Sequence, residues 1–65
     1  MLTFVSAMEK GGRRAAVYRD SEWEEYRVRF TENGVYLPDA DYHTDDKSDA
    51  LDTASMWVVR SRSVP

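Results

Sequence analysis

The sequence has 65 residues, contains no cysteine and carries a formal net charge of −3 at pH 7. This length fits one small domain with a modest core, because such a chain buries only ~60% of its unfolded surface. The lack of cysteine excludes disulfides and thiolate metal sites, and no apolar run approaches the ~18 residues of a membrane span. The first residues also lack the pattern of a signal peptide, so a cytoplasmic location is expected.

The charge is distributed unevenly along the chain. Residues 1–38 hold six basic and six acidic side chains, whereas residues 39–52 hold six aspartates and one lysine, and residues 53–65 add two arginines. An acidic chain is poorly suited to nucleic acid, whose binding depends mostly on neutralising phosphates. A protein partner with a basic patch matches this charge better.

The first part of the chain predicts a β-hairpin. Residues 2–9 read as a strand, with the even-numbered residues from Leu2 to Met8 on one face and the odd-numbered residues on the other. Both faces are fairly apolar, so the pattern leaves open which one is buried. Gly11 and Gly12 suit a tight turn with positive φ, and residues 14–20 form the return strand.

The next segment predicts a turn followed by a second hairpin. Asp20 and Ser21 favour a turn, in which Trp23 would either fold back over the sheet edge or, if exposed, make contacts with a partner. Residues 24–31 alternate between apolar and polar side chains, as a half-buried strand does. Asn33-Gly34 is a strong hairpin signal, and residues 35–38 form a short edge strand that Pro38 ends.

The pairing of this second hairpin can be predicted from its two-residue turn. Glu32 should lie opposite Val35, Thr31 opposite Tyr36, and Phe30 opposite Leu37. One face would then be buried, and Tyr36 would share the outer face with Arg27 and Arg29. The predicted buried residues are Tyr26, Val28, Phe30, Val35 and Leu37.

A helix is predicted over residues 45–58, with Thr44 as its N-cap and Asp45 as the alternative. The apolar residues from Ala50 onward recur in steps of three and four and form one stripe. Trp57 and Met56 are more often core than interface in so small a domain, and residues 57–63 fit either helix or strand, with helix favoured. The residues of the apolar stripe are Ala50, Leu51, Ala54, Trp57 and Val58.

Together these elements predict an α+β fold in a single domain spanning residues 1–65. It is an antiparallel β-meander of three to four strands with one C-terminal helix packed on a sheet face. A meander leaves two sheet edges unpaired, so a homodimer through an edge is one hypothesis.

No catalytic constellation or cofactor motif is found in the sequence. His43 lies near Asp41 and Asp45 and could act as a general base, but no supported nucleophile accompanies it. The spacing of Asp39, Asp41 and His43 resembles the start of a calcium loop, yet its sixth and twelfth positions hold Thr44 and Ala50 instead of glycine and a carboxylate. We therefore expect no enzyme activity, no metal and no cofactor.

Two surfaces are candidates for binding. The first is an acidic partner-binding surface, whose plainer interpretation is a capped helix with a solvated acidic face. The second is a basic-aromatic sheet face that could stack the bases of single-stranded nucleic acid. The residues of the first are Asp39, Asp41, Asp45, Asp46, Asp49, Asp52 and Trp23, and those of the second are Arg19, Arg27, Arg29 and Tyr36.

Residues 16–54, through the segments VYRDSEWEEYRVRF and GVYLPDADYHTDDKSDALDTA, resemble the small, uncharacterised early or accessory proteins of tailed bacteriophages. The resemblance implies a host-directed binding role in the host cytoplasm, often inhibition of a host enzyme or defence system. It supplies no site residues. The sequence thus predicts a non-enzymatic protein that binds and modulates a host protein through an acidic surface, with a nucleic-acid-binding accessory domain as the alternative.

Overall fold

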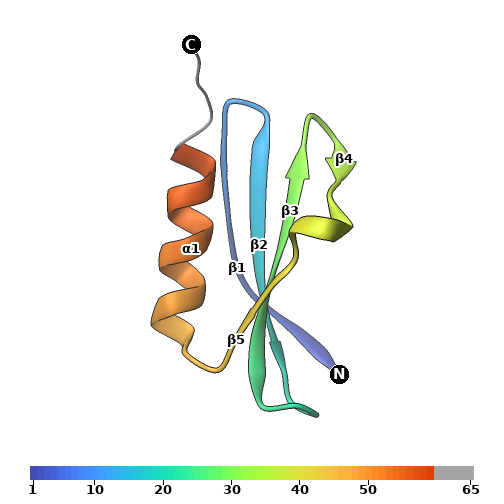
Figure 1. Ribbon diagram of the computed structural model, residues 1–65, viewed down its shortest axis with the longest axis vertical. Coiled ribbons are helices and arrows are strands. Elements are labelled where there is room, and N and C mark those ends of the chain that lie inside the picture. The colour runs from blue at the N-terminus through green and yellow to red at the C-terminus, as the bar shows by residue number, and fades with distance from the viewer. Residues whose placement is uncertain (60–65) are drawn as a thin grey trace.

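The computed structural model describes residues 1–59, which form an antiparallel sheet with one helix packed on it (Figure 1). Neighbouring strands in the main path follow chain order, so the sheet is a meander, and the predicted α+β fold is confirmed. The strands are β1 (Leu2–Lys10), β2 (Arg13–Asp20), β3 (Glu25–Glu32), β4 (Val35–Tyr36) and β5 (Tyr42–Thr44). A 3-10 helix, η1 (Pro38–Ala40), precedes β5, and the α-helix α1 spans Lys47–Val59.

Both hairpins turn where the sequence predicts. Gly11 and Gly12 have φ angles of 57° and 84°, and Asn33 and Gly34 have 51° and 83°. Two consecutive positive φ angles give a turn whose twist matches the flanking strands, and glycine and asparagine tolerate this conformation best. The second hairpin has the predicted register, in which Thr31 pairs with Tyr36.

The far edge of β3 is covered differently from the prediction. The last strand was expected over residues 35–38, but β4 ends at Tyr36, because Pro38 begins η1 instead of continuing the strand. The chain then returns as β5, which pairs with the first half of β3 and which the sequence did not predict. Segments β4, η1 and β5 therefore lie in succession along this one edge.

The core lies between α1 and one face of the sheet. Val17 and Val28 face each other across β2 and β3, and both are fully buried beneath Ala50 and Ala54. Small alanines let the helix approach the sheet closely, and the predicted apolar stripe of α1 is confirmed as the packing face. Trp57 closes one end of the core, with its ring 4.6 Å from that of Phe30. Met56 and Val35, both assigned to the core from the sequence, are instead 55% and 62% exposed.

A β-bulge divides β1. Its register against β2 shifts between Phe4 and Ser6, so the two halves of the strand do not keep one alternation. Phe4 pairs with Tyr18 on the face away from α1, whereas Met8 pairs with Ala15 on the face that α1 covers. The expectation that the even-numbered residues from Leu2 to Met8 share one face is therefore wrong.

The N-cap of α1 is Asp46 and neither Thr44 nor Asp45. Its Oδ1 accepts hydrogen bonds from the backbone N–H groups of Ser48, at 2.8 Å, and of Asp49, at 3.3 Å. Thr44 instead accepts a hydrogen bond from the backbone N–H of Asp46 and shapes the turn before the helix. The helix continues to Val59, and the ambiguity over residues 60–63 lies outside the described residues.

Candidate functional site

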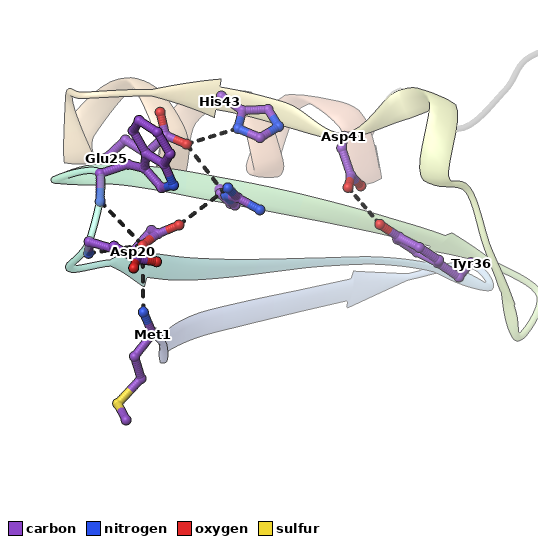
Figure 2. A network of polar contacts seen from close by, with 9 residues as sticks. Met1, Asp20, Glu25, Tyr36, Asp41 and His43 are labelled. Carbon is purple, nitrogen blue, oxygen red and sulfur yellow. Dashed lines mark hydrogen bonds and ion pairs between the residues drawn. The ribbon is translucent and has the colours of Figure 1, made fainter.

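Asp20 organises a polar network at one end of the sheet (Figure 2). It is the last residue of β2 and is only 5% exposed, on the face that α1 leaves uncovered. Its Oδ1 accepts from the backbone N–H groups of Glu22 at 3.0 Å and Trp23 at 3.4 Å, and lies 3.7 Å from the amino group of Met1. Its Oδ2 lies 3.2 Å from a terminal nitrogen of Arg27. One carboxylate thus fixes the following turn to the N-terminus and to β3.

The charged state of Asp20 is stabilised by these neighbours. Burial by itself would raise the pKa of Asp20, because a buried carboxylate loses solvation. The amides of Glu22 and Trp23, the N-terminal ammonium and the Arg27 guanidinium more than offset this effect and hold the pKa below its ordinary value. The group therefore remains an acceptor-only carboxylate at neutral pH.

Glu25 extends the network to β5. Its Oε2 lies 3.0 Å from Nδ1 of His43 and 3.4 Å from Nε of Arg27. The hydrogen bond from His43 is the main cause of a lowered Glu25 pKa, which the arginine also favours and burial opposes. His43 stands opposite Arg27 in the β3–β5 register. The Glu25–His43 contact therefore joins the edge strand β5 to β3. The structure thus gives His43 a carboxylate partner on β3 in place of its sequence neighbours Asp41 and Asp45.

Trp23 is presented to solvent by the β2–β3 turn. Its side chain is 70% exposed, so it does not fold back over the sheet edge. The Asp20 carboxylate orders the backbone of the turn, and Glu24 takes the left-handed conformation with a φ of 53°. Glu22 and Glu24, which flank the indole, are exposed as well. The turn therefore presents a large aromatic ring between two carboxylates.

The six aspartates predicted to form an acidic surface divide into two groups. Asp46 caps α1, Asp41 Oδ2 accepts a 2.6 Å hydrogen bond from the Tyr36 hydroxyl, and Asp49 Oδ2 accepts one of the same length from Tyr42. These three carboxylates hold the fold together. The three that are exposed and make no side-chain hydrogen bond or ion pair within residues 1–59 are Asp39, Asp45 and Asp52.

Part of the acidic segment lies at the same end of the molecule as the turn that carries Trp23. Thr44 pairs with Tyr26 near the start of β3, and Glu25 at that start pairs with Asp20. The start of α1 and the β2–β3 turn therefore lie at the same end of the molecule, as Figure 1 shows. Asp39 and Asp41 lie further along the edge of β3. We call the shared end the acidic end and define it by Glu22, Trp23, Glu24, Asp45 and Asp46.

Three of the four residues predicted to form the basic-aromatic face lie on one face of the sheet, and the fourth does not. Arg27, Arg29 and Tyr36 lie on the uncovered face, as expected. Arg19 stands opposite Tyr26 on the other face, with its guanidinium 5.7 Å from the centre of that ring. The structure therefore separates Arg19 from the other three residues.

Two aromatic residues of the uncovered face were missed by the sequence analysis. Phe4 and Tyr18 meet edge to face with ring centres 5.9 Å apart, and the Arg29 guanidinium lies 5.4 Å from the Tyr18 ring and 6.0 Å from the Tyr36 ring. We call Phe4, Tyr18, Arg29 and Tyr36 the aromatic row. The alternation of β2 was the signal that could have identified Tyr18, since successive side chains of a strand point to opposite faces and Val17 is in the core.

Carboxylates reduce the positive character of this face. Arg27 is engaged by both Asp20 and Glu25, and Asp41 lies against the Tyr36 hydroxyl. Within residues 1–59, Arg29 makes no ion pair and its Nε is buried without a hydrogen-bond partner. Arg29 is thus held by the two tyrosine rings and not by an acid.

Residues 1–59 contain no detected pocket, no group of three or more side chains placed to hold a metal ion, and no helix long and apolar enough to cross a membrane. No protein-family model, no curated protein and no solved structure matches this chain.

Proposed function

We propose that this protein is a small, non-enzymatic, phage-type protein that binds a host protein with a basic patch and modulates or inhibits it in the host cytoplasm. The observation that carries the proposal is the exposed indole of Trp23 on a turn that the buried Asp20 holds in place. Tryptophan is enriched among the residues that contribute most to binding between proteins. An ordered turn also loses little conformational entropy when a partner binds it.

The charge around Trp23 supports a basic partner. Glu22 and Glu24 flank Trp23 in the turn, Asp45 lies at the same end of the molecule, and all three are exposed, while the segment 39–52 is the most acidic stretch of the chain. Charges of one sign around an aromatic anchor steer an oppositely charged partner to the site and reject partners of like charge. The phage origin and the host target follow from the resemblance of residues 16–54 and are part of the proposal.

The test is an affinity capture from a bacterial lysate with tagged protein, followed by mass spectrometry. Two variants address the site: Trp23→Ala, and a triple variant with asparagine at Asp39, Asp45 and Asp52, whose carboxylates make no side-chain bond within residues 1–59. The control is Val35→Ala, which removes an equally exposed apolar side chain in β4, beyond the second hairpin turn.

The proposal expects one stoichiometric protein that is released at high salt, is lost with Trp23→Ala and the triple variant, and is kept with Val35→Ala. Circular dichroism confirms that each variant is folded. Capture of the same protein by both site variants would show that neither Trp23 nor the exposed aspartates form the binding site.

A second candidate function rests on the aromatic row. Arg29 lies between Tyr18 and Tyr36, and the exposed ring of Phe4 contacts Tyr18, so the row offers rings for base stacking and one cation for a phosphate. A fluorescence-anisotropy titration with single-stranded oligonucleotides at low salt tests this directly, because electrostatic binding is strongest there. Binding that Tyr36→Ala and Arg29→Ala both weaken would support the second function, and no binding at low salt would exclude it.

A further inference from the structure

The two edges of the sheet are protected very differently. The edge of β3 is covered in turn by β4, η1 and β5. On the opposite side, β1 pairs with β2 along one side only, and no strand within residues 1–59 pairs with the other side. The helix does not protect this edge, because α1 lies over β2 with β1 and β3 to either side. Within residues 1–59, the outward backbone groups of this nine-residue strand therefore have no strand partner.

The sequence of β1 carries few of the features that normally prevent edge pairing. Edge strands are usually shortened or marked by charged residues and proline. The stretch from Leu2 to Met8 contains neither, and the only charged side chains of β1, Glu9 and Lys10, lie at its end. The bulge at Val5 interrupts the edge but leaves Ser6–Lys10 in regular register with β2. This uninterrupted half is long enough to pair with another strand.

We propose that two copies of the protein associate through their β1 edges in antiparallel orientation, which joins the two sheets into one. A two-fold axis makes such a contact self-complementary, since the same residues serve on both sides. In a register centred on Ala7 or Met8, where the regular half of β1 takes part, Glu9 and Lys10 of one copy face uncharged residues of the other. No like charges then meet across the new ladder.

Electrostatics favour the antiparallel arrangement of the two copies over a parallel one. The acidic end lies at the end of the sheet where β1 begins, because Leu2 pairs with Asp20. An antiparallel pair places the two acidic ends at opposite ends of the dimer, where their repulsion is screened by salt. A parallel pair would bring them side by side. If the proposed function is correct, the dimer is bivalent, with two binding sites pointing in opposite directions.

The hydrogen-bonding pattern of the β1–β2 hairpin identifies a substitution that tests this contact. Lys10 and Arg13 flank the two-residue turn, and in an antiparallel ladder the hydrogen-bonding pairs alternate from that point. Ala7, which stands opposite Ala16, therefore directs its N–H away from β2. Proline at such a position is tolerated in an edge strand but removes the donor that a second strand requires. Ala7→Pro tests the contact, and Ala7→Val is the matched control that keeps the donor.

The primary test is analytical ultracentrifugation of the isolated wild-type protein over a wide range of concentration, without any partner. We expect a reversible change from the mass of one chain to twice that mass, a monomer for Ala7→Pro, and a dimer for Ala7→Val. A wild-type protein that stays monomeric throughout would overturn the proposal. Because no binding partner is present, this outcome is independent of whether the acidic end binds a host protein.

Amide hydrogen exchange of the wild-type protein keeps the test decisive if Ala7→Pro does not fold. The outward-facing amides of β1, Ala7 among them, should exchange more slowly at high concentration than at low concentration, while those of β4 should not change. A dimer in which the β1 amides exchange equally fast at both concentrations would place the contact elsewhere and overturn the proposal.

Discussion

The carboxylate of Asp20 and the guanidinium of Arg27 lie 3.2 Å apart on the sheet face that α1 leaves uncovered. Arg27 also lies against Glu25, which bonds to His43 of β5, and Asp20 lies near the N-terminal amino group (Figure 2). This chain of polar contacts links the start of β1, the β2–β3 turn and β5. It stabilises the parts of the fold that the small core between α1 and the sheet does not reach.

The network predicts loss of stability in acid. The pKa values of Asp20 and Glu25 are both lowered in the folded state, so their contribution to the free energy of unfolding is complete above the ordinary carboxyl pKa. It is lost as pH falls from that value through the lowered pKa. Urea unfolding at a series of pH values should show this decline, and Asp20→Asn should reduce both the stability at neutral pH and the slope in acid.

The control for Asp20→Asn is Asp39→Asn, which neutralises an exposed carboxylate that makes no side-chain bond within residues 1–59. It should leave the acid dependence as it is in the wild type. Equal effects of the two substitutions would mean that net charge, and not the Asp20 network, determines the acid sensitivity.

The N-cap assignment gives a second prediction. Asp46→Ala removes the acceptor for two backbone N–H groups in the first turn of α1 and should cost about 1 kcal/mol of stability. Asp45→Ala removes a neighbouring carboxylate that caps nothing and should cost only a few tenths of a kcal/mol through the helix dipole. Thermal or urea unfolding measures both losses of stability. A larger loss for Asp45→Ala than for Asp46→Ala would mean that Asp45, and not Asp46, is the N-cap.

The elements with strong periodicity were predictable from the sequence, and the elements set by tertiary contacts were not. The two hairpins follow from paired residues with positive φ, and the stripe of α1 follows from its spacing. Strand β5 has only three residues, which are too few to show a periodic pattern in the sequence, and it forms by pairing with the free edge of β3. The N-cap was ambiguous because Thr44, Asp45 and Asp46 all have a side-chain oxygen that can accept from a backbone N–H. The path of the backbone before α1 decides which of them reaches the first turn of the helix.

The candidate sites were predictable to a smaller extent. The alternation of residues 24–31 placed Arg27, Arg29 and Tyr36 together correctly, because they belong to one hairpin. Arg19 was assigned to that face without a register between β2 and β3, and the register puts it on the other side. The sequence also could not show which aspartates are used internally, since Tyr36 and Tyr42 meet Asp41 and Asp49 only through the folded chain.

Close packing of α1 on the sheet gives a third prediction. Ala54 is fully buried against the core, where a larger side chain has no room without moving the helix. Ala54→Leu should therefore destabilise the protein by about 1–3 kcal/mol, although leucine is itself a good helix former. Ala40→Leu, which adds the same atoms at an exposed position, should change little. A stabilised Ala54→Leu variant, measured by thermal unfolding, would mean that the helix–sheet interface contains unfilled space.

Two tyrosines predict a separate loss of stability in base. The Tyr42 hydroxyl donates to Asp49 and joins β5 to α1, and the hydrogen bond to this carboxylate is the main cause that raises the pKa of Tyr42. The bond to Asp41 raises the pKa of Tyr36 in the same way. A raised folded pKa gives stability that is complete below the ordinary tyrosine pKa and is lost as pH rises through the raised value.

Asp49→Asn keeps an acceptor but removes the charge, so the ultraviolet titration of tyrosinate should shift toward the ordinary pKa for one tyrosine. Asp52→Asn on the same helix should leave the titration unchanged, and a shift of equal size there would show that the general acidity of α1, and not the Tyr42–Asp49 bond, raises the pKa.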